Sequence, residues 1–165
     1  YRLALDEAGA PVLSVFGGKL TTYRKLAEQA MDRIAPLLGG GAAWTAGAVL
    51  PGGDIADGDP AAFEARLRRQ YPFLAPSLAR RLADSYGTRA LHILDGIDSV
   101  AALGAPVVAD LYPCELHYLV QHEFARTAED ILWRRSHLGL IVPPEDVARL
   151  GAWLASAEAG KKRAI

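Results

Sequence analysis

The spacing of apolar residues predicts a strand and then a long helix at the start of the chain. Residues 11–16 form a nearly continuous apolar run between glycines, which indicates a buried strand. From residue 20 to Leu38, apolar side chains recur every three or four positions, so a helix of about five turns begins near Thr21. An earlier run, residues 1–5, can pair with this strand as a hairpin, with residues 6–10 as the loop.

After residue 38 the pattern changes to a connector and then to helices only. Three glycines, residues 39–41, end the first helix, and residues 39–58 are rich in glycine with few charges. Helix start signals follow at Asp59-Pro60, Pro76, Thr88, Thr127 with Asp130, and Pro143-Pro144. Side chains expected on the inner helix faces include Phe63, Leu67, Leu78, Leu82, Leu116, Leu119, Val120, Phe124, Ile131, Leu132, Trp133, Val147, Leu150, Trp153 and Leu154.

The predicted fold is therefore mainly α-helical. It has a strand or hairpin with one helix at residues 1–38, a connector at residues 39–58, and an all-helical domain at residues 59–165. With 51% apolar residues in 165, the chain can bury a real core. A net charge of −1 provides no field for nucleic acid, and no apolar run has the length of a membrane span. The one cysteine, Cys114, excludes an internal disulfide.

The segment Val15-Phe-Gly-Gly-Lys-Leu-Thr-Thr-Tyr-Arg24 places glycines and cations where the strand meets the helix. A helix start has free N–H groups and favours acidic side chains, yet Lys19, Arg24 and Lys25 crowd this one. Gly17 and Gly18 have no Cβ, so a ligand can approach the backbone closely. Two interpretations stay open, a binding site for an anion and a tight turn with solvated lysines.

Other candidate chemistry in the sequence is weak. The four histidines have no metal-ligand spacing, and Asp54, Asp57 and Asp59 lack the pattern of a calcium loop, so we expect no metal site. Arg134 and Arg135 lie four to six positions from Glu129 and Asp130, which favours structural ion pairs over ligand binding. A basic face of Arg66, Arg68, Arg69, Arg80 and Arg81 is interrupted by Glu64 and Asp84.

Two long blocks of sequence resemble one enzyme family. Phe16-Gly-Gly-Lys-Leu-Thr-Thr-Tyr-Arg-Lys-Leu-Ala-Glu28 is similar to the end of the flavin domain in FAD-dependent, quinone-reducing glycerol-3-phosphate dehydrogenases. Thr127-Ala-Glu-Asp-Ile-Leu-Trp-Arg-Arg-Ser-His-Leu-Gly139 resembles the C-terminal signature of that family. Two shorter blocks, Leu50-Pro-Gly-Gly53 and Ser85-Tyr-Gly-Thr-Arg-Ala90, lie between them in the order of the family. The resemblance covers roughly residues 12 to 140.

The resemblance implies that the parent enzyme oxidises sn-glycerol 3-phosphate to dihydroxyacetone phosphate and passes electrons through FAD to a quinone. It places Lys19 beside the flavin and the substrate, as a catalytic and substrate-binding residue, with Arg24 as a second substrate contact. Gly17 and Gly18, with the backbone N–H groups of Leu20, Thr21 and Thr22, would hold the flavin. Residues 1–38 would be the C-terminal end of the FAD-binding domain.

The G-x-G-x-x-G turn that binds the FAD pyrophosphate is not found in the sequence, and the chain opens on Tyr1. We therefore expect a C-terminal piece of a bacterial enzyme that by itself neither binds FAD nor turns over substrate. The expected partners are the rest of the FAD domain and, for the parent, glycerol 3-phosphate and quinone. The expected location is cytoplasmic, with the parent peripheral on the membrane. Alternatives left open are a helical interaction or homodimerisation module, and part of a glycerol-3-phosphate oxidase that uses oxygen.

Overall fold

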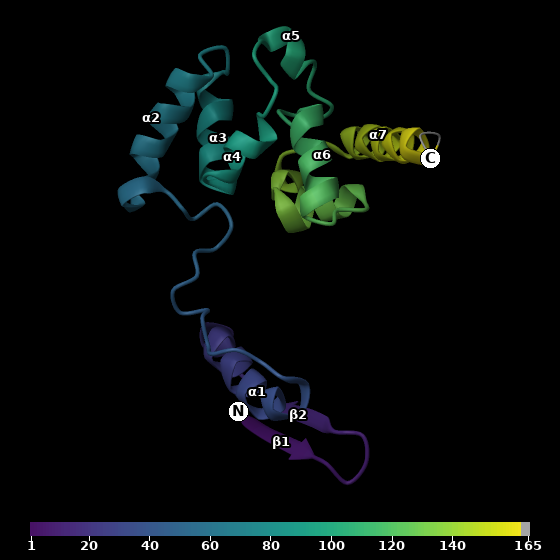
Figure 1. Ribbon diagram of the computed structural model, residues 1–165. Coiled ribbons are helices and arrows are strands. Elements are labelled where there is room, and N and C mark those ends of the chain that lie inside the picture. Colours follow the sequence, from purple (N-terminus) through teal and green to yellow (C-terminus); the bar gives the residue numbers. More distant parts are fainter. Residues whose placement is uncertain (163–165) are drawn as a thin grey trace. The chain divides into compact units, whose positions relative to one another are not determined.

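The computed structural model describes residues 1–162, which form two compact units (Figure 1). Unit 1 is Tyr1–Val49, and unit 2 begins at Leu50. The chain is mainly helical with one short hairpin, so the predicted fold class is confirmed. The last three residues of the helical domain expected at 59–165 lie outside the described residues.

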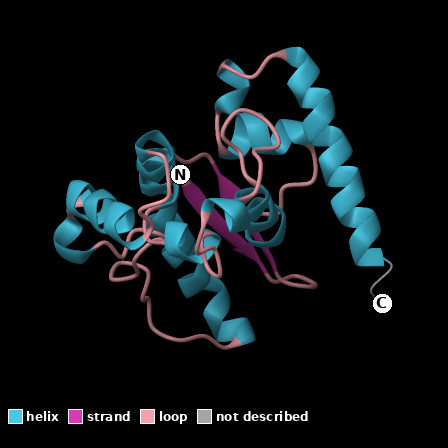
Figure 2. Ribbon diagram, turned by 90° about the horizontal axis from the view of Figure 1, so that it is seen from above, coloured by secondary structure: helices cyan, strands magenta, loops and turns pink. Residues whose placement is uncertain are grey.

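Unit 1 contains the hairpin and one long helix. Strands β1 (Arg2–Asp6) and β2 (Val12–Phe16) are antiparallel, with Leu3 opposite Val15 and Leu5 opposite Leu13 (Figure 2). A single 3-10 turn, η1 (Leu20–Thr22), leads into helix α1 (Tyr23–Leu38). The helix ends where Gly39 takes a φ of 76°, a conformation that favours glycine.

Unit 1 has no interior of its own. None of its described side chains is buried, although many are large and apolar. A two-stranded ribbon with one helix cannot enclose a core, so its apolar surface is left open. The exposed apolar side chains of unit 1 are Tyr1, Val12, Val15, Phe16, Leu20, Tyr23, Met31, Leu37, Leu38, Trp44 and Val49.

Unit 2 is built from helices and short helical turns. Prolines occupy the first turns of four of its helices, where a missing N–H is harmless. Asp59 caps helix α2 (Pro60–Gln70) by accepting from the N–H groups of Ala61 and Ala62 at 3.0 and 3.1 Å. Its elements are η2 (Ala56–Gly58), α2 (Pro60–Gln70), α3 (Pro76–Tyr86), α4 (Arg89–Ile93), α5 (Val100–Leu103), α6 (Pro113–His122), the π-helical turn η3 (Asp130–Arg135), η4 (Leu138–Leu140) and α7 (Pro144–Lys162).

The buried core of the protein lies in unit 2. Helix α3 packs against α2 and α4, while α6 contacts α4 and the π-helical turn η3. Apolar side chains at helical spacing meet at these contacts and leave water. The largest fully buried apolar side chains are Leu67, Leu82, Leu94, Leu111, Leu116, Leu119, Ile131, Leu132, Leu150 and Val108. Within residues 1–162, no helix is both long and apolar enough to span a membrane.

Three sequence predictions about the core are wrong. Phe124 is 73% exposed, because α6 ends at His122 and Phe124 takes a left-handed φ of 57° outside the helix. Val147 is 38% exposed in the first turn of α7, and Trp133 is half exposed because its ring lies over Gly139 rather than in the core. The exposure of these three side chains depends on where a helix begins or ends and on which residues lie beside it. The spacing of apolar residues does not show either.

Candidate functional site

The Gly17-Gly18 turn joins strand β2 to the first helical turn of unit 1. Both glycines have positive φ, 75° and 145°. A Cβ on Gly18 would lie 3.3 Å from Cδ2 of Leu26, so glycine lets the start of α1 approach the strand closely. The sequence therefore forms a tight strand-to-helix turn here, with Lys19 extended at φ −123° directly before the 3-10 turn.

The N–H groups of this turn are only partly engaged. Thr22 donates twice to the carbonyl oxygen of Lys19, from its backbone N at 3.0 Å and from its hydroxyl at 3.1 Å. The N–H groups of Leu20 and Thr21 have no backbone acceptor among the described residues. The side chain of Lys19 is exposed and forms no ion pair within residues 1–157. Lys19, whose ammonium is unpaired within residues 1–157, therefore directly precedes two residues whose N–H groups have no backbone acceptor among the described residues.

Arg24, the second predicted substrate contact, is engaged inside unit 1. Its Nη1 lies 2.7 Å from Oε1 of Glu28, and the Thr45 hydroxyl donates to the same carboxylate oxygen at 2.5 Å. The hydrogen bond from Thr45, helped by the charges of Lys25 and Arg24, lowers the pKa of Glu28. This network ties the segment after Gly41 to the first turns of α1.

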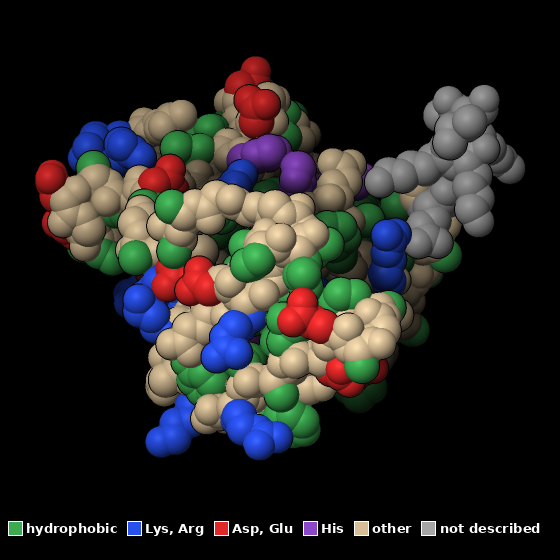
Figure 3. Space-filling view, turned by 60° about the horizontal axis from the view of Figure 1, so that its bottom comes forward, with side chains coloured by type: hydrophobic (Ala, Val, Ile, Leu, Met, Phe, Trp, Pro, Cys, Tyr) green, Lys and Arg blue, Asp and Glu red, His purple; other side chains and the backbone are tan. Residues whose placement is uncertain are grey.

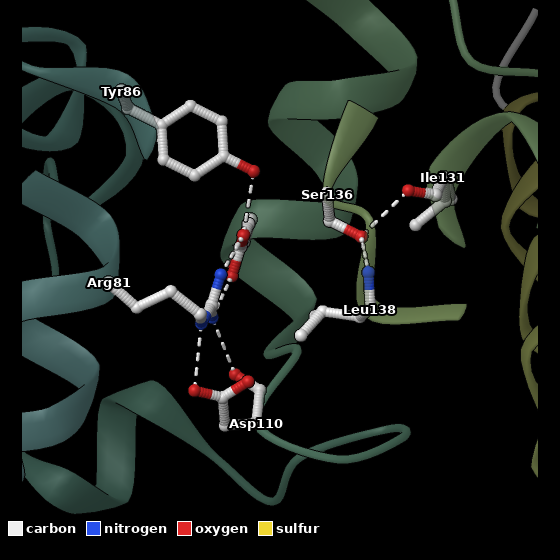
Figure 4. Close-up of polar contacts among 7 residues, drawn as sticks. Arg81, Tyr86, Asp110, Ile131, Ser136 and Leu138 are labelled. Atoms are coloured by element: carbon white, nitrogen blue, oxygen red, sulfur yellow. Dashed lines mark hydrogen bonds and ion pairs between the residues drawn. The ribbon is translucent and has the colours of Figure 1, made fainter. Parts of the chain in front are cut away.

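Unit 2 contains a buried polar network that sequence reasoning missed. Arg81 on α3 forms a two-pronged ion pair with Glu115 on α6, both N–O distances being 2.7 Å (Figure 4). Its Nε also donates to Asp110 at 2.7 Å, and the Tyr86 hydroxyl donates to Glu115 at 2.7 Å. Arg81 is therefore not part of an exposed basic face. No pairing signal in the sequence relates positions 34 residues apart.

The network raises the pKa values of two of its members, Arg81 and Tyr86. Burial disfavours the charge on Arg81, but Glu115 and Asp110 outweigh it and raise the pKa of the guanidinium. Burial and then the Glu115 charge raise the pKa of the Tyr86 phenol. Glu115 is 1% exposed, and its carboxylate oxygens accept hydrogen bonds from Arg81 and Tyr86. The arrangement is suited to holding α3 and α6 together, not to acid–base chemistry.

The two short sequence blocks meet in unit 2. Thr88 donates from its backbone N to the Gly52 carbonyl at 3.0 Å and from its hydroxyl to Asp54. Gly52 and Gly87 both have positive φ and pack backbone to backbone, leaving no room for a Cβ. Thr88 is the N-cap residue of α4, as predicted, but its hydroxyl donates to Asp54 and caps no N–H group of the helix. That hydrogen bond lowers the pKa of Asp54.

Beside this contact lies a cleft of about 410 Å³, lined by the start of unit 2, the end of α3, α4 and α6. Tyr118 is 8% exposed and lines the cleft. Its hydroxyl forms no hydrogen bond within the described residues, where no fully buried polar side-chain atom lacks a partner, so the hydroxyl is in contact with solvent. Burial raises the pKa of the phenol, the nearby Glu123 raises it further, and Arg89 opposes both. Arg89 is exposed at the cleft and forms no ion pair among the described residues.

Aromatic rings pack against Tyr118 and hold its ring in place. Its ring stacks on His122 at 5.1 Å between centroids and meets the edge of Tyr86 at 5.7 Å. His92 lies 4.6 Å from His122, and histidine side chains (purple) gather on the face shown in Figure 3. Among the described residues, no group of three or more His, Cys, Asp or Glu side chains is arranged to hold a metal.

The remaining charged candidates have structural roles. Arg134 pairs with Glu129 at 2.8 Å and Asp130 at 2.9 Å, as the spacing predicts. Asp130 also accepts from the N–H groups of Arg126 and Thr127, both at 3.0 Å, so the predicted capping pair is confirmed. These two backbone bonds and the Thr127 hydroxyl lower the pKa of Asp130 to about 2. Asp59 caps α2 and Asp54 bonds Thr88, so neither is a free ligand.

Comparison with known proteins identifies the family. Residues 43–150 match the model described as the C-terminal domain of alpha-glycerophosphate oxidase. The chain belongs to this family. The matched residues include the Arg81–Glu115 network, the Gly52–Gly87 contact and the cleft, so unit 2 corresponds to the alpha-glycerophosphate oxidase C-terminal domain.

Relatives of this family extend the match into unit 1. The chain is 50% identical over 151 residues to the aerobic glycerol-3-phosphate dehydrogenase of Escherichia coli, covering 90% of this chain and 30% of the relative. It is 48% identical over 159 residues to a glycerol-3-phosphate dehydrogenase of Pseudomonas aeruginosa, covering 94% and 31%. A D-erythritol 1-phosphate dehydrogenase of Brucella abortus is 41% identical over 161 residues, covering 95% and 32%. The chain thus spans about a third of the length of these relatives.

Proposed function

We propose that this chain is the C-terminal part of an FAD-dependent enzyme that oxidises sn-glycerol 3-phosphate to dihydroxyacetone phosphate. The observation that carries the proposal is the identity of 50% and 48% to two glycerol-3-phosphate dehydrogenases over at least 90% of the chain. Electrons would pass from the flavin to a quinone. FAD would supply the hydride acceptor when bound, because no amino-acid side chain can do so.

The Gly17-Gly18 turn fits one edge of such a cofactor. The two glycines leave the backbone open to close approach, and the N–H groups of Leu20 and Thr21 are free to stabilise negative charge. Lys19 directly precedes them in the chain, and its exposed ammonium would favour an anionic flavin or the oxygens of the substrate. The Thr22 hydroxyl and N–H hold the Lys19 carbonyl and so fix the turn.

Arg24 has a different proposed role from Lys19. Because its guanidinium is held by Glu28 and approaches Thr45, it orients the start of α1 rather than reaching for a ligand. Direct contact of Arg24 with the substrate would require this ion pair to open. Lys19 is therefore the residue of this chain that we assign to the substrate and the flavin.

The open apolar surface of unit 1 supports its assignment to a larger flavin domain. Leu20 is 88% exposed and Tyr23 is 58% exposed, directly beside the Gly-Gly turn. Large exposed apolar areas on soluble proteins mark surfaces that another domain covers. Unit 2, with its own core, would then be an accessory domain that supports the catalytic body.

The test is oxidation of sn-glycerol 3-phosphate, followed with an artificial electron acceptor, by the complete protein that contains this chain. Activity in the complete protein and none in the 165-residue chain supports the proposal; no activity in either contradicts it. A run with oxygen as the only acceptor separates dehydrogenase from oxidase. D-erythritol 1-phosphate is the second substrate to test, because a relative 41% identical to the chain is named for it.

A further inference from the structure

We propose that the cleft beside the Gly52–Gly87 contact is a second ligand site, which binds a small phosphate ester that also carries hydroxyl groups. It is distinct from the Gly17-Gly18 turn, because its walls belong entirely to unit 2. The choice of a phosphorylated polyol within this class rests on the proposed function. The site itself rests on the geometry of unit 2.

The phenol of Tyr118 provides one hydrogen-bond donor at the cleft. More than nine-tenths of this residue is buried, but its hydroxyl has no protein partner within the described residues and is in contact with solvent. Such a hydroxyl can exchange a bound water for an oxygen of a ligand. Its ring cannot turn away, because Tyr86 and His122 pack against it. A bound hydroxyl or phosphate oxygen would satisfy this group.

The guanidinium of Arg89 provides a positive charge at the cleft. It lines the same cleft, and no carboxylate within the described residues pairs with it. Arginine is always charged, and its planar donors suit phosphate oxygens. Ser85, at the end of α3, adds a hydroxyl to the same wall. Three donors from α3, α4 and α6 therefore surround one space, and a phosphate has three oxygens to accept from them.

Acidic side chains in the same cleft favour a ligand that carries hydroxyl groups in addition to its phosphate. Glu123 lies beside Tyr118 and is 3.8 Å from Arg135, and Asp84 is 3.5 Å from Arg80. These carboxylates repel a bare anion but accept hydrogen bonds from hydroxyl groups. Among the described residues that line the cleft, one unpaired cation and two carboxylates therefore fit a polyol phosphate better than inorganic phosphate.

The cleft is also preorganised. The Gly52–Gly87 packing and the Thr88 hydrogen bonds fix the wall formed by the start of unit 2. The Arg81–Glu115–Tyr86 network fixes α3 against α6. When the walls of a site do not reorganise on binding, little of the binding free energy is lost to ordering them. Residues of the two short sequence blocks, 50–53 and 85–90, thus form part of the wall of this cleft. This role is independent of the Gly17-Gly18 turn.

The test is calorimetric titration of the 165-residue chain with sn-glycerol 3-phosphate, inorganic phosphate and glycerol, with circular dichroism to verify folding of each variant. We expect one molecule of sn-glycerol 3-phosphate per chain, weaker binding of inorganic phosphate and no binding of glycerol. Arg89→Gln removes the charged donor and should weaken binding at least about tenfold. Tyr118→Phe keeps the ring and should weaken it several-fold.

Two further variants make the result decisive. Arg126→Gln removes an exposed arginine outside the cleft and should leave binding unchanged. Lys19→Ala should also leave it unchanged, because Lys19 is not among the residues that line the cleft. No binding by the wild-type chain, unchanged binding by Arg89→Gln, or loss of binding in Lys19→Ala would each overturn the second site. None of these results would bear on turnover by the complete enzyme, so this proposal and the proposed function can fail separately.

Discussion

Arg81 and Glu115, which are 34 positions apart, form the buried ion pair that joins helices α3 and α6. Two N–O distances of 2.7 Å make the pair bidentate, and Asp110 and Tyr86 satisfy the remaining polar atoms. A buried charge pair is costly to form but much costlier to break on one side, because the remaining charge cannot reach water. The integrity of unit 2 therefore depends on both partners together.

Replacing Arg81 by methionine should destabilise the chain severely. The change leaves the Glu115 carboxylate, which is 1% exposed, without its cation, and such losses cost about 3–5 kcal/mol. Urea unfolding measures the difference. Arg80→Met is the matched control: its pair with Asp84 is 73% and 61% exposed, so its loss should cost no more than about 1 kcal/mol. Equal losses from the two variants would show that the pair does not hold unit 2 together.

Gly52→Ala should destabilise unit 2 more than Gly58→Ala. Both glycines have positive φ, 88° and 61°, so either alanine meets backbone strain of roughly 1–2 kcal/mol. Only at Gly52 does the new Cβ also run into the Tyr86 carbonyl, which adds about 1–3 kcal/mol of overpacking. The comparison of their thermal midpoints separates the two effects. Matching midpoints would mean that the Gly52–Gly87 contact relaxes freely.

The Thr127–Asp130 capping pair should make the stability of unit 2 depend on acid pH. The pKa of Asp130 is lowered from 3.8 to about 2 in the folded chain, so its contribution is complete above pH 4 and is lost as the pH falls through 2. The difference in unfolding free energy between wild type and Asp130→Asn should therefore shrink between pH 4 and pH 2. A difference that stays constant over this range would contradict the role of the carboxylate charge.

In the complete enzyme, Lys19→Ala should slow reduction of the flavin by sn-glycerol 3-phosphate, by a factor on the order of a hundred if Lys19 stabilises developing charge. Stopped-flow absorbance of the flavin measures this rate. Lys19 is exposed and unpaired within residues 1–157, so stability should change by less than about 0.5 kcal/mol. Lys25→Ala, which removes a cation held 3.4 Å from Glu28, is the control. An unchanged rate in Lys19→Ala would remove this residue from the mechanism.

Local signals in the sequence predict much of the secondary structure of this protein. Helical spacing, glycine stops and the caps at Asp59 and Thr127–Asp130 depend on residues within four positions of one another, and all of them are present in the structure. The Gly17-Gly18 turn was visible for the same reason, because two adjacent glycines and a cation cluster are a local signal. Family membership also followed from contiguous blocks.

The contacts between residues far apart in the chain follow from the tertiary fold. It paired Arg81 with Glu115, brought Gly52 to Gly87 and Thr45 to Glu28, and placed Tyr118 and Arg89 in one cleft. Periodicity assigns a side chain to a helix face but does not say which other face it packs against. Burial and ion pairing depend on which faces pack together, because both arise when surfaces from distant parts of the chain meet and exclude water.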